Sequence, residues 1–206
     1  MDEKNTATRF GLVRHATTFW NLEKRIQGRL NADLAPIGED MARRWGTLLK
    51  DGGWRRILVS SSGRALQTAR LVNRRLKLPL HPEARLQEQD WGRWSGLRLP
   101  DLVAEHGEAL EAQVAAGWDF RPPGGESRRD VRQRAGRALV DAAARWPGER
   151  VLVVTHEGVI KCLLYHLAGR AFLPTEPALI RPGHLHLVEV RDGRPAIVAV
   201  NHLPLT

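Results

Sequence analysis

The chain has few of the features that secreted or membrane-bound proteins depend on: it holds one cysteine, Cys162, and no apolar run long enough to span a bilayer. A single cysteine cannot form an internal disulfide, which favours a reducing, cytoplasmic location. The first ten residues, MDEKNTATRF, carry acidic side chains and no apolar stretch, so they predict neither a secretory signal nor a membrane anchor. We therefore expect no membrane partner and interpret Cys162 as a small buried residue, not a catalytic thiol.

Acidic residues are outnumbered by basic ones: 32 Lys and Arg against 23 Asp and Glu give a net charge of +9. Nucleic-acid-binding proteins commonly gather their basic residues in one dense patch or tail. Here the arginines are scattered through nearly every segment, so we expect no nucleic-acid partner. Some arginines are better explained as the lining of a pocket for an anionic substrate. A basic scaffold that binds phosphorylated ligands or nucleic acid without turnover is a remote alternative.

The length of 206 residues and the absence of a linker or repeat predict a single domain over 1–206. Residues 1–7 are expected to form a flexible tail. A looser pattern over about 98–125 combines a helical stretch near Leu102 to Val114 with the turn-rich FRPPGG. We interpret this insertion as a small helical lid over the binding crevice.

Short apolar runs alternate with helical patterns, which is typical of an α/β fold. Five runs predict strands: Phe10–Val13, Ile57–Val59, Val151–Val154, Leu185–Val190 and Ala196–Val200. The first three are expected to be buried parallel strands, and the last two, joined at Asp192-Gly193, to form a hairpin near the sheet edge. The sequence thus predicts a mostly parallel central sheet with an antiparallel edge.

Helices are expected between these strands. One opens at Pro36 with Ile37, Met41, Trp45 and Leu48 on its inward face. The next is expected to take capping hydroxyls from the serines of 60–62 and to bury Ala65, Ala69, Val72 and Leu76. A third helix is expected to begin at a capping box formed by Ser127 and Asp130. A fourth is expected directly after the strand that leads into His156.

Two of the predicted strands lead into a histidine: the first into Arg14-His15, and the third through Thr155 into His156. The carboxyl ends of parallel strands face the crevice in which open α/β sheets bind ligands, so these side chains are expected to converge. A neutral imidazole is a competent nucleophile, and a guanidinium matches two phosphate oxygens at once. Arg64, on a first helical turn, adds a further anion-binding group.

Four segments occur in a characteristic order: LVRHATTFWN, RILVSSSGRALQTA, ARLQEQDWGRWSG and VLVVTHEG, with QGRLNADLAPIG and PPGGES between them. Together they resemble the histidine phosphatase superfamily, which includes the cofactor-dependent phosphoglycerate mutases. The resemblance covers roughly Arg9 to Val200, and any one segment alone is weak evidence. It implies a three-layer α/β/α sandwich.

The resemblance also assigns roles. It makes His15 the nucleophile that becomes phosphorylated, and Arg14, Arg64 and His156 the clamp around the phosphoryl oxygens. Asn21 matches a further phosphate contact. Glu88 matches the proton donor. The residues assigned to catalysis are His15, Glu88 and His156, and those assigned to substrate binding are Arg14, Asn21, Arg64 and His156.

The implied activity is a phosphomonoester hydrolase that uses a phosphohistidine intermediate, needs no metal or other cofactor, and acts on a small phosphate ester. A phosphoglycerate mutase is the alternative; it requires a lid that supplies cations and excludes water, for which the 98–125 segment is short. The sequence leaves the substrate and the oligomeric state open, a homodimer being one option. Glu83 and Asp90 lie close enough in sequence to replace Glu88 as the donor.

Two positions depart from the family pattern, in which a glycine follows each histidine: Ala16 follows His15, and Glu157 follows His156. A carboxylate beside a phosphate site repels the substrate unless it points to solvent or meets a cation. Glu157 could also cap the helix N-terminus or select the leaving group.

Five further side chains have a structural and a functional interpretation. Trp20, Trp91 and Trp94 either line a substrate pocket or close the core, and His184 and His186 lack the carboxylate or cysteine partners that a metal site requires.

Overall fold

The computed structural model describes residues 6–205. Most of the tail predicted for 1–7 lies outside the described residues; the first strand begins at Thr8. Within residues 6–205, no helix combines the length and the apolar character needed to cross a membrane.

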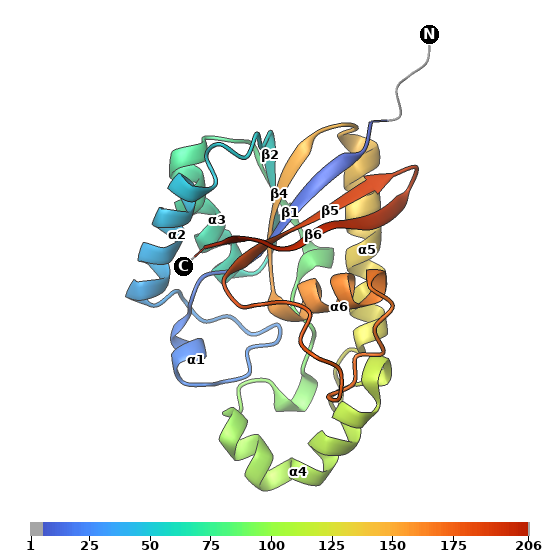
Figure 1. Ribbon diagram of the computed structural model, residues 1–206. Helices are drawn as coiled ribbons and strands as arrows, with labels where there is room; N and C mark the ends of the chain where they lie inside the picture. Colours follow the sequence, from blue (N-terminus) through green and yellow to red (C-terminus); the bar gives the residue numbers. More distant parts are fainter. Residues whose placement is uncertain (1–5, 206) are drawn as a thin grey trace.

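A six-stranded sheet forms the centre of the molecule (Figure 1). Its strands are β1 (Thr8–Arg14), β2 (Arg56–Ser60), β3 (Leu80–Glu83), β4 (Arg150–Thr155), β5 (His184–Arg191) and β6 (Arg194–Pro204), in the order β3-β2-β4-β1-β5-β6. The four strands from β3 to β1 are parallel, whereas β5 and β6 are antiparallel to their neighbours. The predicted mostly parallel sheet with an antiparallel hairpin at its edge is confirmed.

The helices are α1 (Phe19–Leu22), α2 (Pro36–Leu48), α3 (Gly63–Leu76), α4 (Leu99–Ala115), α5 (Arg128–Arg145) and α6 (Glu157–Leu167). Three 3-10 turns, η1 (Ala84–Leu86), η2 (Gly92–Trp94) and η3 (Gly117–Asp119), flank α4. The capping box predicted at the start of α5 is present, since the Ser127 hydroxyl accepts from the Asp130 N–H and the Asp130 carboxylate accepts from the Ser127 N–H.

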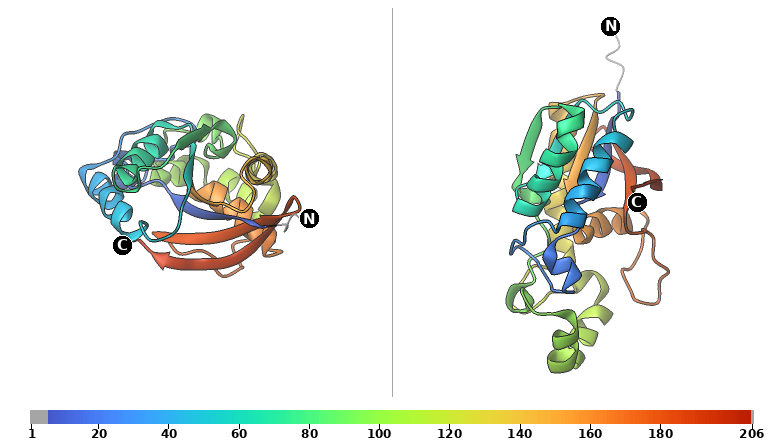
Figure 2. Two further views of the ribbon diagram at one scale, coloured as in Figure 1. Left: turned by 90° about the horizontal axis from the view of Figure 1, so that it is seen from above. Right: turned by 90° about the vertical axis from the view of Figure 1, so that its left-hand side faces the viewer.

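Alternate residues of the strands pack into two separate cores. Phe10 and Leu12 of β1 pack with α5 and α6, whereas Val13 packs with α2 and α3. Figure 2 shows α5 end on in its left panel, on the opposite side of the molecule from α2 and α3. The chain is therefore a three-layer α/β/α sandwich, as the resemblance implies.

The segment predicted as a lid forms α4 and η3 and has a small core of its own. Leu102 of α4 packs with Trp94 and Phe120, all three buried. The helix is kinked at His106, whose φ of −137° is not helical. Figure 1 places α4 at the pole toward which β1 runs, beyond the carboxyl ends of the parallel strands.

The inward face predicted for α2 is wrong in part. Ile37 and Leu48 are exposed, and the helix instead buries Gly38, Ala42 and Gly46 at intervals of four residues. These small residues let the α2 backbone approach its neighbours closely: a Cβ on Gly38 would lie 2.0 Å from the Thr17 carbonyl oxygen, two residues after His15. Close backbone packing, which hydrophobicity does not report, decides the orientation of this helix.

We expect Gly38→Ala to destabilise the protein by about 1–3 kcal/mol, because the added methyl group must displace the backbone of Thr17. Gly136 in α5 is the matched control, since nothing lies within 4 Å of a Cβ there. Gly136→Ala should add roughly 0.5–1 kcal/mol of stability through helix propensity. Urea unfolding midpoints measure both; equal midpoints for Gly38→Ala and the wild type would contradict the packing argument.

Candidate active site

His15 follows the last residue of β1, and its backbone fixes it to β4. The His15 N–H donates to the Thr155 carbonyl at 2.8 Å. The ring Nδ1 lies 2.8 Å from the Ala16 carbonyl oxygen, which can only accept, so Nδ1 carries the ring proton. Nε2 is therefore left with its lone pair, which accepts from Nε of Arg64 at 3.2 Å.

The surroundings of His15 favour the neutral imidazole. Its exposed fraction is 5%, and burial lowers the pKa of His15 well below the ordinary value. The positive charges of Arg14 and Arg64 lower this pKa further. Nε2 is thus unprotonated at neutral pH.

Arg64 stands on the first turn of α3 and is almost completely buried, at 1% exposure. Its two terminal nitrogens donate to the carbonyl oxygens of Leu30 at 2.7 Å and Gly28 at 2.8 Å. Burial lowers the pKa of Arg64 to about 10, with Glu88 acting in the opposite direction, so the guanidinium is still charged at pH 7. Each terminal nitrogen has a second N–H left for an anion.

His156 is the N-cap residue of α6 and is fully buried. Its Nε2 lies 2.8 Å from the Ser60 hydroxyl and 3.1 Å from the Ser62 hydroxyl, while its Nδ1 has no hydrogen-bond partner. When one of these hydroxyls donates to the single lone pair of Nε2, Nδ1 carries the ring proton and has no acceptor among residues 6–205, and a buried donor of this kind calls for an oxygen ligand. The ring centroids of His15 and His156 are 5.2 Å apart.

The capping role predicted for the serines of 60–62 is wrong. Ser62 is the N-cap residue of α3 but makes no side-chain cap hydrogen bond. The Asn31 side chain instead accepts from the Arg64 N–H at 2.9 Å. The hydroxyls of Ser60 and Ser62 instead contact the ring of His156, the residue that follows the neighbouring strand β4.

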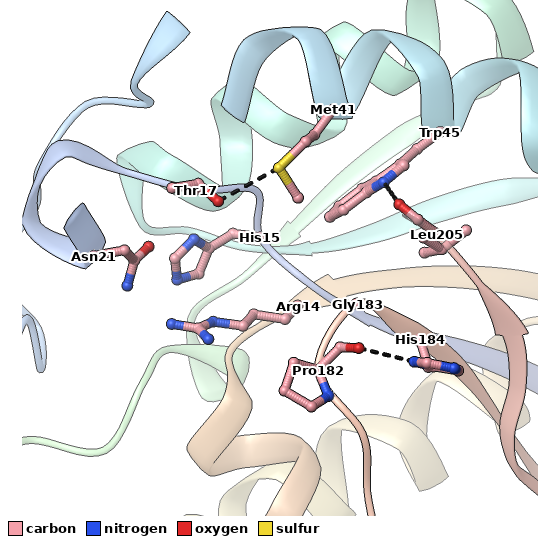
Figure 3. A pocket seen from close by; sticks show the side chains of 10 residues that line it. All are labelled: Arg14, His15, Thr17, Asn21, Met41, Trp45, Pro182, Gly183, His184 and Leu205. Carbon is pink, nitrogen blue, oxygen red and sulfur yellow. Dashed lines mark hydrogen bonds between the residues drawn. The ribbon is translucent and has the colours of Figure 1, made fainter. Parts of the chain in front are cut away.

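Arg14 and Asn21 line a cavity of about 330 Å³ together with His15. Figure 3 shows the imidazole, the guanidinium and the Asn21 amide directed toward a common space. The Asn21 Oδ1 is used by Thr18, whose N–H and hydroxyl both donate to it at 3.0 Å. The amide nitrogen of Asn21 makes no hydrogen bond to the described residues and is left for a ligand oxygen. Met41 and Trp45 form an apolar wall of the cavity.

Glu88 lies against the first turn of α6. Its Oε2 accepts from the Gly158 N–H at 3.2 Å, and its Oε1 accepts from the Gln89 N–H at 2.8 Å. A Cβ on Gly158 would lie 2.4 Å from Oε1, so a side chain at this position would force the Glu88 carboxylate to move. Arg134 of α5 fixes this loop by donating to the Glu88 carbonyl at 3.1 Å.

The two alternatives to Glu88 have other partners. Glu83 caps η1 and pairs with Arg85 at 2.7 Å, and Asp90 accepts from the Gly92 N–H at 2.8 Å. Only Glu88 of the three acts on the pKa of Arg64.

Glu157, the departure from the family pattern, meets two cations. One carboxylate oxygen lies 2.6 Å from Arg14 and the other 2.7 Å from Lys161, one turn further along α6. Burial acts to raise the pKa of Glu157, but Arg14 and Lys161 outweigh it and lower this pKa. The carboxylate is therefore ionised between Arg14 and Lys161.

The remaining candidates have structural partners. Trp94 closes the small core of the α4 segment, whereas Trp91 lines a cavity beside Glu88 and Trp20 stacks with Arg25. His186 is buried, and its Nδ1 accepts from the Asn201 N–H at 3.1 Å. His184 makes a local contact with the Pro182 carbonyl. Among residues 6–205, no three His, Cys, Asp or Glu side chains are grouped as metal ligands.

Sequence reasoning missed the groups that hold Arg64 and His156. The carbonyls of Gly28 and Leu30 carry no side-chain signal, although both residues fall within the QGRLNADLAPIG segment of the resemblance. The tie between the serines and His156 spans 94 and 96 residues, a separation that no local pattern reports.

The geometry can be compared with known proteins. The structure of YhfR from Bacillus stearothermophilus superposes with a TM-score of 0.87 and 31% identity, covering 97% of this chain and 99% of that chain. A mycobacterial glucosyl-3-phosphoglycerate phosphatase in complex with VO3 gives a TM-score of 0.83 at 26% identity, covering 94% and 98%. The alpha-ribazole phosphatase of Shigella flexneri gives 0.77 at 27% identity, covering 94% and 96%.

Proteins with similar sequences are named as phosphatases or phosphoglycerate mutases. The chain is 30% identical to "Uncharacterized phosphatase PhoE" of Bacillus subtilis over 158 residues, which cover 77% of this chain and 76% of that protein. It is 33% identical to "Probable phosphoglycerate mutase GpmB" of Salmonella paratyphi B over 159 residues, covering 77% and 74%. Residues 10–203 match the sequence model of one family, the histidine phosphatase superfamily (branch 1), and the chain belongs to that family.

Proposed function

We propose that the protein is a phosphomonoester hydrolase that works through phosphorylation of His15. The observation that carries this proposal is the unprotonated Nε2 of His15, which lies 3.2 Å from the buried guanidinium of Arg64. The unpartnered Nδ1 of His156, on the neighbouring ring, is a donor in the tautomer whose Nε2 accepts from a serine hydroxyl. A nucleophile with cationic donors around it matches the needs of phosphoryl transfer.

In the first step, Nε2 of His15 forms a bond to phosphorus while the bond from phosphorus to the ester oxygen breaks. Arg14, Arg64, His156 and Asn21 bind the phosphoryl oxygens, whose charge spreads in the transition state. Glu88, in its protonated form, transfers its proton to the departing alkoxide, which leaves as an alcohol.

In the second step, a water molecule attacks the phosphorus of phosphohistidine. Glu88, now a carboxylate, takes a proton from this water, and the phosphorus–nitrogen bond breaks with its electron pair returning to Nε2. Inorganic phosphate leaves, and the enzyme regains its starting protonation state.

The proposed substrate is a small phosphate ester, and the proposed location is the cytoplasm. The cavity of about 330 Å³ beside His15 has the size of a small-molecule site. Two of the similar structures are named for phosphatases of such esters, glucosyl-3-phosphoglycerate phosphatase and alpha-ribazole phosphatase. The apolar side chains of Met41 and Trp45 supply contact area for the alcohol portion.

A phosphoglycerate mutase is the second candidate because of the 33% identity to GpmB. A mutase has to hold its phosphorylated intermediate and return the phosphoryl group without losing it to water. The helix α4 itself contains Asp101, Glu105, Glu108 and Glu111 and neither Lys nor Arg, whereas Arg98 and Arg121 lie on either side of it in the 98–125 segment. An acidic helix does not hold a second anionic substrate group, so hydrolysis is favoured.

We expect His15→Ala to lower kcat/KM for 4-nitrophenyl phosphate by at least about 10³-fold, because it removes the nitrogen proposed to accept the phosphoryl group. Glu88→Gln should lower it by roughly 10²–10⁴-fold through loss of proton transfer. His202→Ala, on the exposed side of β6, is the matched control and should retain wild-type activity. Wild-type turnover by the His15→Ala protein would disprove the proposal.

The ring of His15 should stay neutral at pH 6.5, because burial, Arg14 and Arg64 lower its pKa. A lowered pKa means that protonation, and loss of nucleophilicity, begin only as the pH falls below about 6.5. Nitrogen NMR of labelled imidazoles, assigned with His15→Ala, measures this. Arg14→Gln removes one lowering charge and should move the midpoint upward; a wild-type midpoint at or above 6.5 would contradict the assigned electrostatics.

Incubation with 2-phosphoglycerate or 3-phosphoglycerate distinguishes the two candidate activities. We expect inorganic phosphate to form faster than the other isomer, since nothing on α4 retains the bound glycerate. Phosphorus NMR follows both products in one sample. Isomer formation that outpaces phosphate release would establish the mutase instead.

A further inference from the structure

The two arginines of the phosphoryl site are held in different ways. Arg64 is buried, and its guanidinium contacts neutral groups: two carbonyl oxygens and the His15 ring. Arg14 has a side chain that is 37% exposed, and its terminal nitrogen contacts the ionised carboxylate of Glu157 at 2.6 Å. Arg14 is thus paired directly with a carboxylate, whereas Glu88 acts on Arg64 only through its charge at longer range.

Glu157 has this effect from a place beside the reacting groups. It follows His156 in the sequence and begins α6, so its carboxylate lies between Arg14 on one side and Lys161 on the other. Both oxygens are engaged by cations, which makes its position well defined. Arg14 also lines the cavity that contains His15, so the ion pair fixes the direction from which Arg14 enters that cavity.

Resting on the proposed hydrolase activity, we infer that Glu157 is a positioning residue that orients Arg14 and limits how tightly the site holds inorganic phosphate. Arg14, Arg64 and Lys161 are three cations, and Glu157 and Glu88 are the carboxylates near them. Without Glu157 this group would present one more unit of net positive charge to the dianionic product. The carboxylate thus favours release of phosphate after each turnover.

Glu157→Gln tests the inference, because glutamine keeps an oxygen that accepts from Arg14 and removes only the charge. With 4-nitrophenyl phosphate as substrate and inorganic phosphate as inhibitor, the Ki for phosphate and the KM should both fall about three- to tenfold, and kcat should not rise. Lys161→Met should act in the opposite direction and raise Ki about twofold or more, because it leaves Glu157 less neutralised.

Glu189→Gln is the matched control for the change in net charge. Its carboxylate faces Arg9 at the start of β1, the end opposite to His15, so Ki should equal that of the wild type. A purely structural role for Glu157 predicts the other sign, since a misplaced Arg14 would raise both Ki and KM. That result, or an unchanged Ki, overturns the inference.

Two further outcomes are separable. Glu157→Gln could instead leave the Ki for phosphate unchanged and alter the preference among esters with cationic, neutral and anionic alcohols. In that case Glu157 determines selectivity for the leaving group, and the inference is wrong. If the wild type itself turns over no phosphate ester, the proposed hydrolase activity fails, whereas Ki shifts in an active enzyme bear on Glu157 alone.

Discussion

The pairing of β1 with β4 is the constraint on which the site depends. In the parallel register Arg14 lies opposite Thr155, so both strands end at the same level and the next residue of each chain segment is a histidine. The N–H of His15 donates to the Thr155 carbonyl and continues this pairing into the site itself. Two rings separated by 141 residues thus come to lie 5.2 Å apart through backbone hydrogen bonds and apolar packing.

Burial of charge is the cost of this arrangement, and neutral rings reduce it. If either imidazole were protonated, its positive charge would be strongly repelled by the two nearby guanidinium groups. Burial and the arginines lower the pKa of both His15 and His156 well below the ordinary value, so the rings are neutral and coexist with the cations. The same lowered pKa leaves an unprotonated nitrogen on His15, which the proposed phosphoryl transfer requires.

The sequence predicts most of the fold and the set of residues at the site, for reasons visible in particular elements. Val151–Val154 and Ile57–Val59 are short, uniformly apolar and rich in β-branched residues, which favours buried strands. In contrast, β3, with the sequence LHPE, contains a proline and polar residues and gives no such signal. Ser62 shows the limit at the site: its residue type suits both a helix cap and a tertiary hydrogen bond. The choice between them depends on His156, which lies 94 residues away.

Glycine shows how packing and chemistry meet in this protein. Gly38 lets α2 approach Thr17, in the loop that follows His15, and Gly158 lets Glu88 rest on the first turn of α6. At both places the missing side chain allows one element to touch the backbone of another, which places a wall of the cavity and a carboxylate, respectively. The free N–H groups at the start of a helix attract anions. At the start of α6 the Gly158 N–H donates to Glu88, so the carboxylate occupies a position that a phosphate could otherwise take. In the proposed mechanism the phosphoryl group is bound instead by Arg14, Arg64 and His156, beside Nε2 of His15.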